Sequence, residues 1–207
     1  MPLLLLDLDN TLIDRDAAFR AAVTAFLAGH GLPAADVDWV MTVDGGGFVP
    51  RDEVATTLTQ RYGVDARPLL DTGAADCVVL EPPVARALTD ARARGWTSVI
   101  VTNGRTAQQE AKIRRTGLDR LVHGWVVSEA AGCRKPEPEI FHAAAATAGL
   151  PLAGAWMIGD SPRADIAGAA ALGLRTVWVA NGRAWSLAGC APTYTASDVT
   201  SAVRLVV

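Results

Sequence analysis

Two aspartates near the start of the chain form the first pattern that could do chemistry. Asp7 and Asp9 lie two positions apart where an apolar run of leucines ends. Side chains two apart in an extended chain point the same way, and two negative charges that close repel unless a cation or a proton lies between them. A divalent metal ion such as Mg²⁺ would meet this need, because hard cations prefer oxygen ligands. The pattern alone also fits an ordinary charged surface, and its place after an apolar strand favours a functional site.

Three more polar clusters follow, each where a strand or an irregular segment ends. Thr102 and Asn103 close a β-branched segment, and Lys135 stands in a loop stiffened by prolines. Asp160 ends a further apolar segment, and Asp165 falls in the first turn of the helix expected after it. Taken singly, these residues also fit a strand-to-turn transition, a solvated lysine and acidic capping of a helix start. Because ligands bind at the carboxyl ends of the strands in open α/β sheets, we interpret the clusters jointly.

Short apolar segments alternate with helical patterns over most of the chain. Strands are predicted from buried or β-branched runs, and helices from a 3.6-residue periodicity that ends at glycine. The expected strands are residues 3–8, 98–102, 122–127, 155–158 and 176–179, and the expected helices after residue 80 are 84–94, 106–116, 138–148, 163–172 and 198–205, with Ser197 as the N-cap of the last. This alternation predicts an α/β fold with a doubly wound parallel sheet.

A helix-only stretch interrupts that alternation. Helices are expected over residues 16–30, 51–62 and 67–79. We therefore predict an α/β core from residues 1–15 and 81–207, with residues 16–80 inserted as a helical subdomain. The run of three glycines after Asp44 is either an ordinary surface turn or a mobile loop that faces a substrate.

Composition excludes several classes of protein. The chain has 207 residues, and 50% of them are hydrophobic, which is too many for a disordered tail. A net charge of -3 gives no sign of a nucleic-acid partner. Three widely spaced cysteines fit neither a disulfide framework nor a CxxC metal site. With no uncharged stretch near the ~20 residues that span a bilayer and no basic segment typical of a signal peptide, we expect a soluble cytoplasmic protein without a membrane partner.

The four polar clusters in this order are far more specific than any one of them. Together they resemble the motifs of the haloacid dehalogenase-like (HAD) hydrolase superfamily, and the resemblance covers nearly the whole chain. It implies a Rossmann-like core. The helical insertion is similar to the C1-type cap of phosphoglycolate phosphatase-like and nucleotidase-like members.

The resemblance implies a role for each motif residue. Asp7 would be the nucleophile that forms an aspartyl-phosphate, and Asp9 would be the general acid and base. Thr102, aided by the amide of Asn103, would hold the phosphoryl group. Lys135 would neutralise charge on the nucleophile and on the transferring group.

The same resemblance implies a Mg²⁺ site. Asp7, a backbone carbonyl of Asp9, and Asp160 would bind the ion, and Asp165 would support the site directly or from behind the ligands. The acid at position 9 favours phosphoryl transfer over carbon–halogen cleavage, since the dehalogenases typically carry an aromatic residue there. A phosphonatase is disfavoured because residues 16–80 contain no lysine for a Schiff base.

We therefore predict a Mg²⁺-dependent phosphatase that acts on a small phosphorylated metabolite, as a monomer or a homodimer. Two alternatives stay open: a phosphomutase of the β-phosphoglucomutase type, and a non-catalytic HAD-fold module that binds a partner. Three arginines of the insertion could bind a second anionic group of the substrate or could simply lie on solvated helix faces: Arg20, Arg51 and Arg61.

Overall fold

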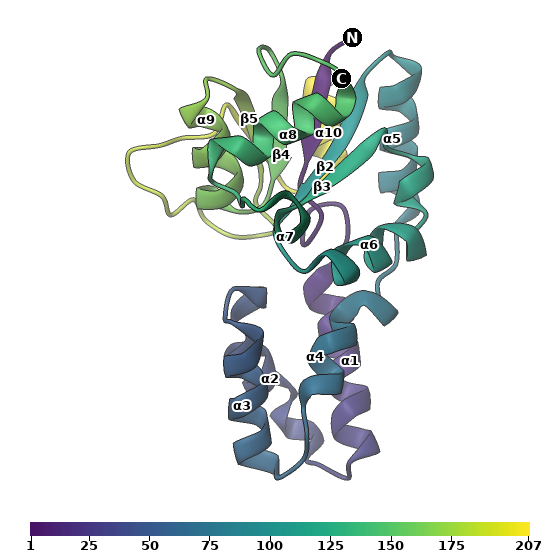
Figure 1. Cartoon of the computed structure of the whole chain (residues 1–207), viewed down its shortest axis with the longest axis vertical. Coiled ribbons are helices and arrows are strands. Elements are labelled where there is room, and N and C mark those ends of the chain that lie inside the picture. The colour runs from purple at the N-terminus through teal and green to yellow at the C-terminus, as the bar shows by residue number, and fades with distance from the viewer. The chain divides into compact units, whose positions relative to one another are not determined.

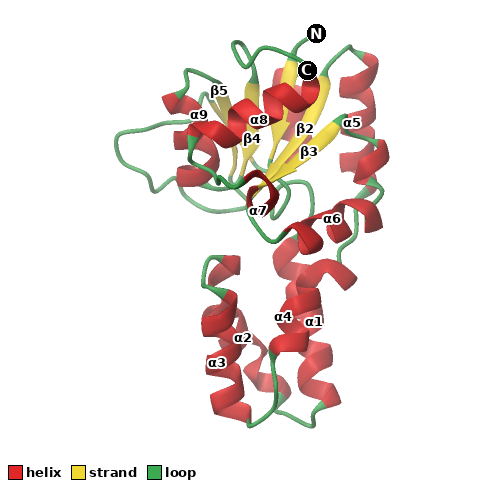
Figure 2. Cartoon of the chain, in the orientation of Figure 1, coloured by secondary structure: helices red, strands yellow, loops and turns green.

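The chain forms two compact units. The computed structural model describes the backbone of residues 1–207, and the environment of every residue except residue 73. The first unit combines residues 1–13 with residues 80–207, and the second comprises residues 14–79. The first holds all the sheet strands, and the second is helical (Figure 2).

A six-stranded parallel sheet forms the centre of the first unit (Figure 1). Its spatial order is β3-β2-β1-β4-β5-β6, which is the order of doubly wound Rossmann-like folds. The strands are β1 Leu3–Leu6, β2 Thr97–Thr102, β3 Gly124–Val127, β4 Trp156–Gly159, β5 Arg175–Val179 and β6 Tyr194–Ala196. The predicted α/β fold with a parallel sheet is confirmed, and β6 is a strand that the sequence pattern did not predict.

The strand order reverses at β1. Leu6 pairs with Ile100 of β2 on one side and with Ile158 of β4 on the other. Successive connections run in opposite directions from this point, and in open α/β sheets ligands bind beyond the carboxyl ends of the strands at such a reversal. The chain's topology thus brings the segment after Leu6 next to the segment after Gly159.

Helices cover both faces of the sheet. The helices of this unit are α5 Pro82–Ala93, α6 Thr106–Arg115, α7 Ser128–Ala131, α8 Pro138–Ala148, α9 Gly168–Ala171 and α10 Val199–Val206. Leu3 and Leu5 share a buried apolar cluster with Ile140 and Phe141 of α8. The helices α5 and α10 pack together on the opposite face. Leucine is a weak strand former, and burial of β1 on both faces is what makes an all-leucine strand favourable here.

Three predicted helices differ from the structure. The helix expected over 67–79 ends earlier, since α4 spans only Arg67–Thr72. The helix expected over 163–172 begins as a π-helical turn, Pro162–Ala167, and continues as α9. The N-cap of α10 is Asp198 rather than Ser197, because the Asp198 carboxylate accepts a hydrogen bond from the Ser201 main-chain N–H at 2.8 Å. The Ser197 hydroxyl instead donates to the Asp198 carboxylate at 2.7 Å.

The second unit is built from α1 Arg15–Gly29, α2 Val37–Asp44, α3 Arg51–Tyr62 and α4 Arg67–Thr72. The helix α2 was not predicted. A fully buried ion pair ties α1 to the end of α2, with Arg15 Nη2 donating to Asp44 Oδ1 at 2.7 Å.

The glycine-rich run after α2 is a turn anchored by this ion pair. Asp44 Oδ2 also accepts a hydrogen bond from the Gly47 main-chain N–H at 2.8 Å. Gly47 has a φ of +83°, and a Cβ there would lie 3.2 Å from Arg15 Cζ, so glycine fits both the backbone and the close approach.

The three arginines that could bind a second anionic group each have an acidic neighbour within this unit. Arg20 pairs with Asp38 at 2.6 Å, and Arg61 pairs with Asp36 at 3.0 Å. Arg51 lies 3.7 Å from the buried carboxylate of Asp44. Among the described residues, no helix has both the length and the apolar character needed to cross a bilayer.

Candidate active site

Asp7 lies at the point where the strand order reverses. Its main-chain N–H donates to the Ile158 carbonyl at 2.9 Å, which continues the pairing of β1 with β4 by one residue. The buried side chain accepts two hydrogen bonds: Oδ1 from Lys135 Nζ at 2.6 Å and Oδ2 from the Thr11 hydroxyl at 3.1 Å. The Asp7 carboxylate therefore has a fixed orientation and a cation in direct contact.

Lys135 is the cation at the centre of this cluster. Its buried ammonium group also donates to the Val101 carbonyl at 2.7 Å and lies 2.7 Å from Asp165 Oδ1. Burial disfavours its charge, but the Asp165 and Asp7 carboxylates more than offset that penalty and raise the pKa of Lys135. The ammonium group thus stays protonated and bridges two carboxylates.

The side chain of Asn103 holds the Lys135 segment in place. Asn103 Oδ1 accepts from the Lys135 main-chain N–H at 2.9 Å, and Asn103 Nδ2 donates to the Lys135 carbonyl at 3.0 Å. Because the side-chain amide is engaged in this way, any contact of Asn103 with a phosphoryl group would use its main-chain N–H.

Three buried carboxylates meet at this edge of the sheet. Asp7, Asp160 and Asp165 each offer an oxygen within 4.8 Å of the others. Asp165 Oδ2 accepts from the Ser161 main-chain N–H at 2.9 Å, which holds the turn after β4. A Cβ at position 159 would lie 2.3 Å from that same oxygen, so only glycine allows Asp165 to approach.

The electrostatics of the cluster fit a bound cation. Burial, together with the nearby Asp165, raises the pKa of Asp7 to about 7 although Lys135 opposes the shift. Burial and the charges of Asp7 and Asp165 raise the pKa of Asp160 to about 8, against the effect of Arg183. Lys135 contacts Asp7 and Asp165, and Arg183 contacts Asp160, so three clustered carboxylates face two cations. A hard divalent cation bound by oxygen ligands would relieve the remaining repulsion.

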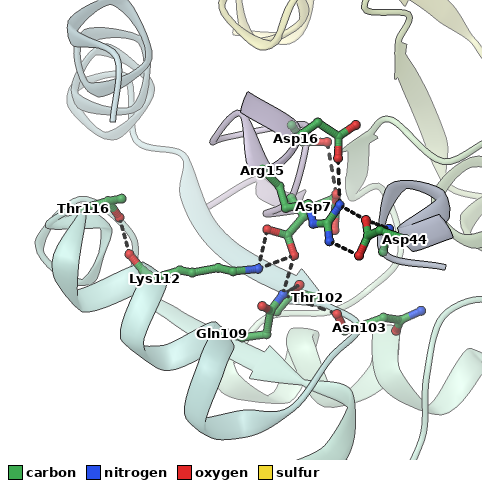
Figure 3. Close-up of polar contacts among 12 residues, drawn as sticks. Asp7, Arg15, Asp16, Asp44, Thr102, Asn103, Gln109, Lys112 and Thr116 are labelled. Carbon is green, nitrogen blue, oxygen red and sulfur yellow. Dashed lines mark hydrogen bonds and ion pairs between the residues drawn. The ribbon is translucent and has the colours of Figure 1, made fainter. Parts of the chain in front are cut away.

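Two polar side chains of α6, Gln109 and Lys112, contact Asp9. Figure 3 shows both side chains pointing the same way from the helix. Lys112 Nζ donates to both carboxylate oxygens of Asp9, at 2.7 and 2.8 Å. Gln109 Nε2 donates to Asp9 Oδ2 at 3.0 Å and to the Thr102 hydroxyl oxygen at 2.6 Å. One helix therefore contacts both the acid that follows β1 and the hydroxyl that ends β2.

Sequence reasoning missed Lys112 and Gln109. One signal was present: the chain contains only two lysines, Lys112 and Lys135, among its 19 basic residues. Both of them make ion pairs with aspartates of the first motif. The scarcity of lysine in an arginine-rich chain could have marked position 112 as a candidate.

The loop after β5 supplies two further residues that the sequence patterns did not indicate. Arg183 Nη2 donates to Asp160 Oδ2 and to the Asp160 carbonyl, both at 2.9 Å. Asn181 Nδ2 donates to the Asn10 carbonyl at 2.7 Å. This loop therefore contacts the segments that follow both β1 and β4.

The structure brings the motif residues together at one edge of the sheet. Asp7, Lys135, Asp160 and Asp165 form one cluster, and Thr102 is joined to Asp9 through Gln109. The histidines lie outside these contacts. His123, for example, accepts a hydrogen bond from the Ser98 main-chain N–H at 3.1 Å and so supports β2.

Comparison with known proteins places this arrangement in a family. A family model described as haloacid dehalogenase-like hydrolase matches residues 1–173. The chain is 31% identical over 186 residues to the N-acetylmuramic acid 6-phosphate phosphatase of Pseudomonas putida, covering 86% of this chain and 82% of that protein. It is 35% identical over 103 residues to the phosphoserine phosphatase of Thermus thermophilus, covering 50% of this chain and 41% of the relative.

A solved structure agrees over the whole chain. The HAD-hydrolase YfnB from Bacillus subtilis, bound to magnesium, superimposes with a TM-score of 0.81 at 26% identity, covering 99% of this chain and 97% of that one. The chain covers less than half the length of six curated relatives, from 41% to 45%. Because the family model covers most of the sequence, this chain belongs to the haloacid dehalogenase-like hydrolase family.

Proposed function

We propose that this protein is a Mg²⁺-dependent phosphatase that hydrolyses a small phosphate monoester through an aspartyl-phosphate on Asp7. The observation that carries the proposal is the buried Asp7–Lys135 ion pair at the strand-order reversal, with Asp160 and Asp165 close beside it. A carboxylate can attack a phosphate dianion only if cations offset the charge that both bring.

In the first step, an oxygen of the Asp7 carboxylate attacks phosphorus, and the bond from phosphorus to the ester oxygen breaks. Lys135 holds Oδ1 of the nucleophile and balances part of the charge. Thr102 and the main-chain amide of Asn103 bind the phosphoryl oxygens. Asp9 gives a proton to the departing oxygen, so the leaving group departs as an alcohol.

In the second step, a water molecule attacks the phosphorus of the aspartyl-phosphate. Its proton passes to the Asp9 carboxylate, the bond from phosphorus to Asp7 breaks, and inorganic phosphate is released. Asp7 returns as a carboxylate and Asp9 returns protonated, which restores the starting state for the next turnover.

The proposed Mg²⁺ ligands are the side chains of Asp7 and Asp160 and the main-chain carbonyl of Asp9. When bound, the ion would act as a Lewis acid that neutralises negative charge on the transferring group. Asp165 is better suited to a supporting role, because one of its oxygens lies beside Lys135 and the other accepts from the Ser161 N–H.

The relatives support a small phosphorylated metabolite as the substrate. Two of them are named as phosphatases of N-acetylmuramic acid 6-phosphate and of phosphoserine. We propose that residues 14–79 serve as the cap that the family resemblance implies and contribute to the choice among such esters.

The test is release of inorganic phosphate from p-nitrophenyl phosphate and from a panel of phosphorylated metabolites, with MgCl₂ and then with EDTA. Wild-type turnover should require the metal, and Asp7→Asn should abolish it. Asp90→Asn, which removes an exposed carboxylate of α5, should leave turnover unchanged. Metal-independent turnover or an active Asp7→Asn variant would contradict the mechanism, and an isomerised sugar phosphate without phosphate release would identify a mutase.

A further inference from the structure

Lys112 is a buried cation whose contacts are concentrated on one carboxylate. Its side chain is only 4% exposed, and its ammonium group binds both oxygens of Asp9, whose own side chain is 27% exposed. Removing a lysine from water is costly unless its charge is paired and hydrogen-bonded. The pair therefore joins a sequestered cation to a carboxylate that keeps access to solvent.

We propose that Lys112 and Gln109 are positioning residues that fix the orientation of the Asp9 carboxylate for proton exchange with the leaving group. This inference rests on the proposed phosphatase function, in which Asp9 is the acid and base. Three hydrogen bonds from two side chains restrain one carboxylate group: two from Lys112 and one from Gln109. A proton donor must be aligned within hydrogen-bond reach of the oxygen it serves, so restraint of this kind affects the rate directly.

Gln109 links the acid to the phosphate-binding hydroxyl. Its Nε2 is shared between Asp9 Oδ2 and Thr102 Oγ1. Since the Thr102 oxygen accepts from Gln109, the hydroxyl proton can point elsewhere and donate to a phosphoryl oxygen. The same amide therefore sets the spacing between the group that binds the phosphoryl oxygens and the group that protonates the departing one.

The helix α6 places these two side chains next to each other, where both contact Asp9. Gln109 and Lys112 are three residues apart and so lie on one face of the helix. Other positions of α6 carry exposed charge, as in the Arg114–Glu110 pair. Gly104 makes room for the approach, because a Cβ there would lie 3.0 Å from Cγ and Cδ of Gln109.

The experiment compares a good and a poor leaving group in Lys112→Met. With 2,4-dinitrophenyl phosphate, the bond to the leaving oxygen breaks without a proton. With an alkyl phosphate, the oxygen must be protonated as it leaves. We expect kcat/KM to fall by about 10²-fold for the alkyl phosphate, the lower range for proton-transfer catalysis, and by less than about threefold for the dinitrophenyl ester.

Matched variants separate positioning from a merely structural ion pair. Arg114→Met removes an exposed cation from the same helix and should behave as wild type for both substrates. Lys112→Arg, which keeps a cation, should recover part of the loss with the alkyl phosphate, and Gln109→Leu should reproduce the selective loss. In an Asp9→Asn background, Lys112→Met should produce no further decrease, because the group it positions is already gone.

Three outcomes would each overturn the positioning role. In Lys112→Met, kcat/KM could fall equally for the two esters, or it could not fall at all. In the Asp9→Asn background, Lys112→Met could cause a full additional loss of kcat/KM. If Lys112→Met does not fold, as judged by circular dichroism, Gln109→Leu and Lys112→Arg give the same comparison. A wild-type protein that hydrolyses neither ester with Mg²⁺ would contradict the proposed function itself. Suppose the wild type is active and Asp9→Asn loses kcat/KM selectively for the alkyl phosphate, while the Lys112 and Gln109 variants show no such selective loss. That result would contradict this inference and leave the proposed function standing.

Discussion

Asn103 and Lys135 are joined by two reciprocal hydrogen bonds, between the side-chain amide of Asn103 and the main-chain N–H and C=O of Lys135. The Lys135 N–H donates to Asn103 Oδ1 at 2.9 Å, and Asn103 Nδ2 donates to the Lys135 carbonyl at 3.0 Å. The residue after β2 thereby fixes the backbone of the residue whose ammonium group reaches Asp7. An asparagine matches both the main-chain donor and the main-chain acceptor of one residue, which neither an ionised aspartate nor a hydrophobic residue could do.

Replacing Asn103 should therefore weaken catalysis through Lys135. In Asn103→Ala the main-chain N–H and C=O of Lys135 each lose a partner, and we expect a stability loss of ~1–3 kcal/mol from the partly buried groups left unsatisfied. Misplacement of the ammonium group should lower kcat by more than tenfold, since a displacement of a catalytic group by about 1 Å can reduce the rate by that factor or more. Thermal unfolding and steady-state kinetics measure the two effects. Gln60→Ala, which removes an exposed amide of α3, is the control and should change neither.

The carboxylate cluster should make stability depend on pH in the absence of a metal ion. The pKa values of Asp7 and Asp160 are raised in the folded protein to about 7 and about 8, first of all by burial. The folded state thus keeps protons that the unfolded chain releases near pH 4, and by linkage the free energy of unfolding falls as the pH rises from about 4 through about 8. Without Mg²⁺, the melting temperature should be lower at pH 8.5 than at pH 5.5.

Adding Mg²⁺ should reverse most of that loss, because the ion binds the ionised carboxylates. The gain in melting temperature on adding MgCl₂ should therefore be larger at pH 8.5 than at pH 5.5. Asp160→Asn removes one proposed ligand and one source of repulsion, and should reduce both the pH effect and the metal effect. An equal Mg²⁺ gain at both pH values in the wild type would argue against a metal site at this cluster.

The motif residues could be predicted because their positions follow from local patterns. Asp7 and Asp160 each come directly after a short apolar run, and parallel strands end at the same edge of a sheet. Thr102 and Lys135 could be assigned to the site only from the order of the motifs and the family resemblance. Taken alone, Thr102 also fits an ordinary turn and Lys135 a solvated side chain. Local sequence thus located the strand ends, and topology brought them together.

The supporting residues could not be predicted in the same way. Lys112 reaches Asp9 across 103 positions and Arg183 reaches Asp160 across 23, and nothing local in either segment marks its partner. The sequence of each segment fits an ordinary element without these contacts: an amphipathic helix around Lys112 and a loop around Arg183. Likewise, β6 is a strand of three residues, Tyr194–Ala196, whose pairing with β5 depends on tertiary context more than on intrinsic propensity.

Arg183 should weaken metal binding at Asp160. Its guanidinium group donates to Asp160 Oδ2 at 2.9 Å, and its side chain is 46% exposed, so the interaction is partly screened by solvent. Arg183→Met removes a cation that competes with Mg²⁺ for the same carboxylate. We expect the dissociation constant for Mg²⁺, measured by isothermal titration calorimetry at pH 8.5, to fall by roughly threefold, in line with an exposed ion pair. Arg163→Met should serve as the control for loss of a nearby cation. Weaker Mg²⁺ binding in Arg183→Met would instead mean that Arg183 orients the ligand.

The buried pair of Arg15 and Asp44 should dominate the stability of the helical unit. In Asp44→Ala the Arg15 guanidinium group would lose the carboxylate that receives two of its hydrogen bonds, and the Gly47 N–H would lose its acceptor. Removing one partner of a buried ion pair typically costs ~3–5 kcal/mol, because a charge is left uncompensated in a poorly solvated site. Asp38→Ala, which breaks the exposed pair with Arg20, should cost less than ~1 kcal/mol. Urea denaturation monitored by tryptophan fluorescence compares the two, and similar losses in both variants would mean that the buried pair contributes no more than a surface contact.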